Sequence, residues 1–325
     1  MKVLWLSNIN IQPATLDQKS ERVNWIDSLK NICIENKNME LAIAYFDKKK
    51  YKKTVLDKVT YYSLPLFKSM LSKVLNKWLL NDTDYYFMEI LKEIINDFQP
   101  EIIQVFGTEG ALGLAPKITE IPTVIHIQGN LNAYFLKWRY GSSYQLVNLF
   151  HAKFKNIILN KSTFSKYYIW KKNLNRERII FKINNNYMGR TKWDHDIVKI
   201  FNQQSNYYHC EEAIRPVFFN RIFKNFYDTS SNKSLSLVSI IGENTYKGLE
   251  LVFRTADILD DVNFKYSWSI IGVKKKSEIV QISKAVAKIS SLDKMQLSFL
   301  GKLYDQNLIY TLENSHLYVH PSHIE

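Results

Sequence analysis

The chain has 325 residues, of which 46% are hydrophobic and 23% charged, and its formal net charge is +13 at pH 7. These proportions are ordinary for a globular protein and exclude a wholly disordered chain. Two cysteines exclude a disulfide scaffold, and no run of about 20 apolar residues occurs that would predict a membrane-spanning helix. Because residues 1–7 have the pattern of a buried strand and not of an export signal, we expect a cytoplasmic protein.

Apolar runs of strand length alternate with helical segments in the first part of the chain. The apolar spacing in residues 20–36 and 82–98 is that of amphipathic helices, which Ser20 and Asp82 can cap. Such alternation is typical of βαβ units and a parallel sheet. The expected strands cover residues 3–6, 41–46, 59–64, 102–106, 123–127, 156–159 and 178–182.

A polar, irregular stretch at residues 219–234 predicts a linker. The alternation then resumes, so we predict an α/β protein with two tandem, doubly wound, Rossmann-like domains, residues 1–218 and 235–325. A helix normally covers a parallel strand, and none follows residue 320, so we expect the second domain to be incomplete at its C-terminus. Its expected strands are 235–241, 266–271, 296–300 and 317–320, and its expected helices are 247–259, 277–289 and 305–314.

Basic side chains are concentrated between Lys137 and Lys192. This stretch holds 13 lysines and arginines and one acidic residue, Glu177, and aromatic side chains are interleaved with them. Three interpretations remain open at this point. The stretch is a solvated face, a binding surface for single-stranded nucleic acid, or a surface that docks on an anionic membrane, where each basic residue contributes about 1 kcal/mol.

Polar residues follow two predicted strands of the first domain. Glu109 lies in a glycine-containing turn after residues 102–106, and His126, Gln128 and Asn130 alternate along the next strand and its final turn. Ligands of open α/β sheets bind at the carboxyl ends of the strands, so these residues are candidates for a binding cleft. The alternatives are a helix-capping acid for Glu109 and a satisfied core histidine for His126.

The second domain has three turns of the same kind. Asn244, Lys247 and Gly248 lie between a strand and a helix, where a lysine and backbone amides suit a phosphate. Gly301 ends another strand, and Ser322 lies in the last turn of the chain. The alternatives are an exposed lysine at a helix start and two ordinary turns. The sequence contains no P-loop, no dinucleotide fingerprint and no convincing metal cluster.

The order and spacing of these motifs resemble the retaining glycosyltransferases of family 4, which have the GT-B fold of two facing Rossmann-like domains. Residues 189–194 and 208–215 resemble the branch of that family that builds bacterial surface polysaccharides. The matching landmarks span nearly the whole chain. They are residues 1–7, 104–109 (QVFGTE), 121–129, Lys247–Gly248, Leu300–Gly301 and the terminal Pro-Ser-x-x-Glu.

The resemblance implies a nucleotide-sugar donor, linked to UDP or GDP, that the second domain holds without a metal or a cofactor. Lys247 would contact the diphosphate, Gly301 the base and Glu325 the donor sugar. The first domain would bind the acceptor and supply the catalytic candidates Glu109, His126 and Gln128. The implied donor-binding residues are Asn244, Lys247, Gly248, Gly301 and Ser322.

Four features depart from the family pattern. The glycine pair that the family often has in its first βα loop is replaced by Val23–Asn24, and Gln128 stands where many members have a histidine, with His126 two residues earlier. The arginine that often accompanies the phosphate-binding lysine is replaced by Glu243 or Asn244, and Arg190 or Arg215 is a candidate substitute. The second glutamate of the Glu-x7-Glu motif would follow Glu325 and is not in this sequence. We therefore expect an incomplete donor site.

These observations lead to a main hypothesis and two alternatives. The main hypothesis is a transferase that adds a sugar to a lipid-linked glycan in surface polysaccharide biosynthesis, peripheral on the inner face of the cytoplasmic membrane. The stretch between Lys137 and Lys192 would contact the anionic lipid. The alternatives are a truncated or non-catalytic partner subunit and a basic nucleic-acid-binding protein, although we expect no nucleic-acid partner because no binding module is present.

Overall fold

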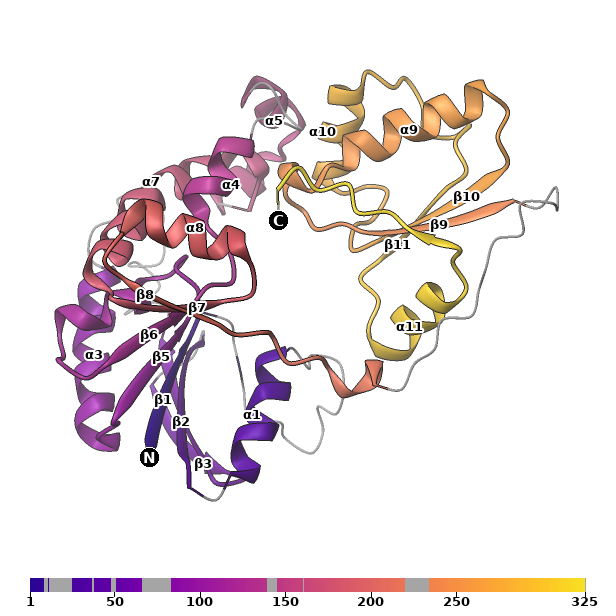
Figure 1. Ribbon diagram of the computed structural model, residues 1–325. Coiled ribbons are helices and arrows are strands. Elements are labelled where there is room, and N and C mark those ends of the chain that lie inside the picture. The colour runs from indigo at the N-terminus through magenta and orange to yellow at the C-terminus, as the bar shows by residue number, and fades with distance from the viewer. Residues whose placement is uncertain are drawn as a thin grey trace. The chain divides into compact units, whose positions relative to one another are not determined.

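The computed structural model forms two compact units, each with its own sheet (Figure 1). The first consists of Met1–Asn132 and Lys172–Arg215, and the second of Ala133–Lys171 and Pro216–Glu325. Within the described residues, no helix combines the length and the hydropathy needed to cross a membrane. The structure describes residues 1–8, 11, 25–36, 38–47, 51–65, 83–138, 145–159, 161–219 and 234–324.

This division differs from the predicted domain boundaries. Residues 133–171 lie in the second unit, whereas the sequence places them in a domain of residues 1–218. The chain therefore passes from the first unit to the second and back. The order of strands and helices along the sequence does not indicate such a crossing. Most of the predicted linker, residues 219–234, lies outside the described residues.

The described part of the first unit contains an eight-stranded sheet with the order β3-β4-β2-β1-β5-β6-β7-β8. All of its strand pairs are parallel except β3–β4, a hairpin whose turn residues Asp57 and Lys58 have φ of 48° and 64°. Two residues with positive φ give the turn that matches strand twist. The strands are β1 (Lys2–Ser7), β2 (Glu40–Asp47), β3 (Lys52–Leu56), β4 (Val59–Pro65), β5 (Ile102–Phe106), β6 (Thr123–His126), β7 (Asn186–Gly189) and β8 (Asn206–His209).

The core of the first unit follows from the continuous apolar sequences of its central strands, which are buried on both faces. Trp5 of β1 and Ile43 of β2 pack with Ile26 of the first helix, and each of the three side chains is at most 1% exposed. Thr191 and Asp194 form a reciprocal capping box at the start of α8. The helices are α1 (Trp25–Glu35), α3 (Thr83–Phe98), η1 (Ala111–Lys117), α8 (Lys192–Phe201) and the second half of α7 (Thr163–Ile183).

The described part of the second unit contains a four-stranded parallel sheet with the order β11-β10-β9-β12. Its core joins Leu237, Trp268 and Ile270 from the strands to Phe253 and Val280 from two helices. The strands are β9 (Leu235–Ile240), β10 (Tyr266–Ile271), β11 (Leu297–Gly301) and β12 (Leu317–Tyr318). The helices are α4 (Leu131–Lys137), α5 (Gln145–His151), α6 (Phe154–Ile158), η2 (Pro216–Phe218), η3 (Thr245–Lys247), α9 (Leu249–Asp261), α10 (Glu278–Ala287), α11 (Asp305–Glu313) and the first half of α7.

Two predicted strands are wrong. Residues 156–159 lie at the end of α6, and residues 178–182 lie inside α7. In the second half of α7 the buried side chains are Glu177, Ile180 and Phe181. Their spacing of three and four residues is helical, and a short apolar run does not distinguish the two periods. The strands that take their places in the sheet, β7 and β8, are four residues long and largely polar, so the sequence did not predict them.

The other predicted strands are confirmed to within two residues at each end. The predicted helices are also confirmed in position, although residues 20–24 lie outside the described residues.

One buried carboxylate holds the first unit together beside its sheet. Glu177 of α7 is fully buried and accepts hydrogen bonds from the Thr108 hydroxyl at 2.6 Å and the Leu131 amide at 2.9 Å. It also accepts the backbone and side-chain N–H groups of Asn132 at 2.8 and 2.7 Å. The carboxylate therefore caps the first turn of α4 and ties it to the loop after β5.

We expect Glu177→Ala to lower the free energy of unfolding by about 3–5 kcal/mol, because it leaves four donors without their acceptor. Chemical denaturation measures the loss, and faster hydrogen exchange at the Leu131 and Asn132 amides localises it. The control is Glu93→Ala on the exposed face of α3, which we expect to change stability by about 0.5 kcal/mol or less. Equal losses in the two variants would contradict this role.

Candidate functional site

The loops at the carboxyl end of the second sheet form the first candidate site. Ligands of α/β sheets bind at this end, and the four strands deliver their turns to it. Three of these turns contain glycines with positive φ: Gly248 at 72°, Gly272 at 105° and Gly301 at 67°. Such backbone conformations leave little alternative to glycine.

Gly248 brings two of these loops into contact. It lies in the left-handed region with φ 72° and ψ 28° and forms the N-cap of α9. A Cβ atom placed there would come within 2.0 Å of the Pro321 carbonyl oxygen. The loop that follows β9 and the loop that follows β12 therefore pack backbone against backbone, with Lys247 and Ser322 each next in sequence to the contact.

The loop before Gly248 is held by contacts within the second unit. The Thr245 hydroxyl donates to the Trp138 carbonyl at 2.7 Å, and the Tyr246 ring stacks on Tyr134 with ring centroids 5.0 Å apart. The Asn244 side-chain amide donates to the Tyr246 hydroxyl at 3.2 Å. Asn244 therefore shapes the loop through its side chain, a role that its position in the sequence does not reveal.

Lys247 ends this loop, and the N-cap Gly248 separates it from the first residue of α9, Leu249. Its ammonium group lies 5.6 Å from the centroid of the Tyr246 ring. The loop delivers it next to the N-terminal end of a 13-residue helix, where backbone amides and the helix dipole favour an anion.

A buried acid–imidazole pair anchors the end of the chain to the same helix. The Glu250 carboxylate, in the first turn of α9, forms a hydrogen bond with the His323 ring, and the two side chains are 2% and 11% exposed. The His323 amide also donates to the Tyr246 carbonyl at 2.8 Å. The sequence did not predict this pair, because nothing in the spacing of residues 250 and 323 indicates that they meet.

The predicted donor residues fall into two groups. Asn244, Lys247, Gly248 and Ser322 gather where the loops after β9 and β12 meet. Gly301 lies at the end of β11, two strands away, where its carbonyl accepts the Gly272 amide at 2.6 Å. Glu325 lies outside the described residues.

The second candidate site lies at the carboxyl end of the first sheet, within the first unit. Gly107 has φ 85°, and a Cβ atom there would come within 2.0 Å of Glu109 Oε2, so the carboxylate lies against the Gly107 backbone. Burial, and to a lesser extent the Glu177 carboxylate, raises the pKa of Glu109 to about 7. A carboxyl group with this pKa can donate or accept a proton near neutral pH.

His126 and Gln128 differ in how deeply they are buried. His126 is fully buried, packs between Trp25 and Phe106, and has no hydrogen-bond partner for its ring nitrogens among the described residues. Burial, followed by the nearby charge of Arg190, lowers the pKa of His126 to about 4, so the ring is neutral at pH 7. This burial favours the core interpretation of His126. Gln128 is only partly buried, and its backbone carbonyl accepts a hydrogen bond from Arg190 at 3.4 Å.

Arg190 also forms an ion pair with Glu212 at 3.0 Å. A candidate for the missing phosphate-binding arginine is thus already paired within the first unit.

The basic stretch between Lys137 and Lys192 is divided between the two units. In the first unit Arg176 donates to the Glu109 carbonyl, Arg178 to Asn132, and Lys192 pairs with Asp196. These basic groups therefore support local structure. The members in the second unit include Lys153, Lys155, Lys161 and Lys166 on or beside α6 and α7.

The described residues contain no group of three or more histidine, cysteine, aspartate or glutamate side chains that could hold a metal ion.

No protein-family model and no curated protein matches the sequence. The structure resembles sucrose-phosphate synthase from Thermosynechococcus elongatus with TM-score 0.61 and 10% identity, over 100% of this chain and 76% of that one. It resembles the catalytic domain of starch synthase IV from Arabidopsis thaliana, bound to ADP and acarbose, with TM-score 0.50 and 10% identity. The similarity covers 98% of this chain and 78% of that one. It also resembles S. aureus MnaA in complex with UDP, with TM-score 0.50 and 12% identity, over 98% of this chain and 73% of that one. These similarities show the fold: two Rossmann-like α/β units, as in GT-B glycosyltransferases.

We expect Gly248→Ala to disrupt the contact between the loops after β9 and β12. The new Cβ atom would collide with the Pro321 carbonyl, and the positive φ adds strain, so the variant should lose about 1–3 kcal/mol of stability. The matched control is Gly242→Ala in the same loop, because a Cβ atom at Gly242 has no neighbour within 4 Å. Thermal denaturation compares the two variants, and an equally stable Gly248→Ala protein would argue against the contact.

Proposed function

We propose that this protein is a glycosyltransferase that uses a nucleotide-sugar donor. The observation that supports the proposal best is the combination of a GT-B fold with Lys247 and Gly248 at the start of α9. The structural relatives include a sucrose-phosphate synthase and a starch synthase bound to ADP. We assign the donor to the carboxyl end of the second sheet and the acceptor to that of the first.

Transfer of a glycosyl group leaves negative charge on the departing diphosphate. In the proposed reaction, the Lys247 ammonium and the first amides of α9 stabilise this charge, without a metal or a cofactor. Gly301, at the end of β11, gives a flat backbone surface for a uracil or guanine base. Asn244 and Ser322 complete the loops around the diphosphate, and Glu325 contacts the donor sugar.

The finer assignment to family 4 implies transfer with retention of configuration and an oxocarbenium-like transition state. In the first unit Glu109 is the residue best placed to exchange a proton at neutral pH, because its pKa is about 7. Gln128 is the neighbouring side chain that is partly exposed. In this proposal His126 has a structural role. Its buried, neutral ring lies beneath the site and supports the end of β6.

The test of the donor site is a thermal-shift panel of UDP- and GDP-sugars with the full chain. We expect one of them to stabilise the protein, by about 2.7 kcal/mol at 100 times its dissociation constant. Lys247→Ala should weaken its binding at least tenfold, or about 1.4 kcal/mol, because a charge-assisted contact is lost. Lys265→Ala, at the opposite end of the sheet before β10, should leave the affinity unchanged. A panel without any stabilisation would instead favour a non-catalytic partner subunit.

We further propose that the acceptor is a lipid-linked glycan, as in surface polysaccharide biosynthesis, and that the protein binds the inner face of the cytoplasmic membrane. The support lies in the short helices α4–α6 of the second unit. Leu136, Phe150 and Phe154 are 80%, 85% and 76% exposed, and Lys153 and Lys155 lie in the same segment. Exposed aromatic and basic side chains side by side suit the interface of an anionic leaflet.

We expect the double variant Phe150→Ser/Phe154→Ser to bind anionic vesicles at least fivefold more weakly than the unchanged protein, because its apolar contact with the acyl region is lost. Co-sedimentation with phosphatidylcholine vesicles containing phosphatidylglycerol measures the change. Ile258→Ser, which removes another exposed apolar side chain from α9, is the control. Binding that ignores the lipid charge and the salt concentration would count against membrane docking.

A further inference from the structure

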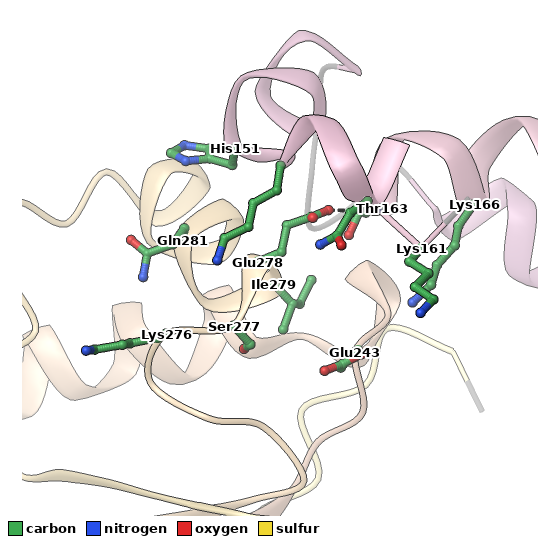
Figure 2. A pocket seen from close by; sticks show the side chains of 12 residues that line it. His151, Lys161, Thr163, Lys166, Glu243, Lys276, Ser277, Glu278, Ile279 and Gln281 are labelled. Carbon is green, nitrogen blue, oxygen red and sulfur yellow. Dashed lines mark hydrogen bonds between the residues drawn. The ribbon is translucent and has the colours of Figure 1, made fainter. Parts of the chain in front are cut away.

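A lysine-lined cavity of about 300 Å³ lies entirely within the second unit (Figure 2). Its walls come from α5, α6, the first turn of α7, the start of α10 and Glu243 in the loop after β9. The residues assigned to the nucleotide-sugar, Asn244, Lys247, Gly248, Gly301 and Ser322, do not line it, although its Glu243 directly precedes Asn244 in the loop after β9. The cavity therefore has a different lining from the donor contacts proposed above.

The charge of the cavity lining is predominantly positive. Four lysines line it, Lys153, Lys161, Lys166 and Lys276, against two carboxylates, Glu243 and Glu278. Glu278 accepts the Thr163 amide at 2.6 Å and so caps α7. In the part of the chain that the structure describes, the four ammonium groups have no hydrogen bond and no ion pair.

A lysine beside the cavity, unlike the four that line it, has an ion-pair partner. Lys275 precedes Lys276 in the chain but pairs with Asp293 at 2.9 Å, outside the cavity lining. The cavity thus brings together lysines that no side chain among the described residues neutralises through an ion pair.

Two helix starts add to this positive field. The 21-residue α7 begins at Thr163 and the 10-residue α10 begins at Glu278, and both residues line the cavity. The N-terminal end of a helix carries a partial positive charge that favours an anion. At α7 this charge is partly offset, because the Thr163 amide already donates to Glu278. At the N-cap of α10, the Ser277 hydroxyl makes no capping bond and is buried without a hydrogen-bond partner among the described residues.

We propose that this cavity binds a phosphate or diphosphate group. Four lysine charges around one cavity, a hydroxyl and the start of α10 match a multiply charged oxyanion better than a single carboxylate. The volume is at the lower end of small-molecule sites and admits a diphosphate with part of its substituent. The source of the group rests on the proposed function, since a sugar transfer offers both a water-soluble nucleoside diphosphate and a lipid-linked phosphate.

The test is a calorimetric titration of the full chain with inorganic pyrophosphate at low salt. It is made in a Lys247→Ala background, so that the lysine assigned to the donor does not contribute. We expect Lys161→Ala/Lys166→Ala to weaken binding at least tenfold and Ser277→Ala to weaken it at least threefold. The matched controls Lys275→Ala and Lys284→Ala also remove one positive charge each from the second unit, outside the cavity lining, and they should stay within twofold.

Vesicle binding separates the two sources. Phosphatidic acid presents a phosphate monoester and phosphatidylglycerol a diester, so vesicles of equal surface charge differ in the headgroup alone. If the cavity variant loses a preference for phosphatidic acid as well as pyrophosphate binding, the group comes from a lipid. If it loses pyrophosphate binding alone, the group is water-soluble. Equal losses in the controls, or no pyrophosphate binding, overturn the proposal.

The experiments distinguish a failure of the donor-site proposal from a failure of the cavity proposal. If no nucleotide-sugar binds the protein but pyrophosphate binding still depends on Lys161 and Lys166, the donor assignment fails and the cavity site stands. If a nucleotide-sugar binds and its affinity depends on Lys247, while pyrophosphate binding ignores Lys161 and Lys166, the cavity site fails.

Discussion

The buried carboxylate of Glu177 determines how the first unit is built around its sheet. It accepts hydrogen bonds from Thr108, in the loop after β5, and from Leu131 and Asn132, at the start of α4. Asn132 also donates to the Leu174 carbonyl at 3.3 Å. The chain leaves the first unit after Asn132 and re-enters it at residue 172, so these bonds join the two crossing points. A carboxyl group buried away from water is costly unless hydrogen-bond donors surround it, and here four do.

Glycine backbone conformations have a comparable role in the second unit. A parallel sheet delivers its loops to one edge, but it does not decide how closely they approach. Gly248 allows the loops after β9 and β12 to touch, and the pair Glu250–His323 keeps them together. The proposed phosphate contacts of Lys247 depend on this arrangement, because the lysine side chain is long and the loop sets where it starts.

The positive charge of the protein serves more than one purpose. Arginines of the first unit bond to backbone and side-chain oxygens, whereas the lysines that line the cavity in the second unit form no ion pair within the described ranges of the chain. This difference fits the two side chains, since guanidinium groups suit fixed hydrogen-bond geometry and ammonium groups suit mobile or exchangeable anions. In the proposed cavity site, lysines and the start of α10 would hold a diphosphate, and the exposed phenylalanines of α5 and α6 suit a ligand or surface that is partly apolar.

The sequence by itself determined the alternating α/β pattern, most strands and the turns that end them, because apolar periodicity and glycine positions are local properties. It did not reveal that residues 178–182 are helical, that residues 133–171 belong to the second unit, or that Glu250 meets His323. Each of these depends on contacts between residues far apart in the chain. The same holds for the candidate sites: Lys247 and Glu109 were visible as residues at strand ends, but the burial of His126 and the gathering of four lysines around one cavity arise only when separate helices and loops pack together.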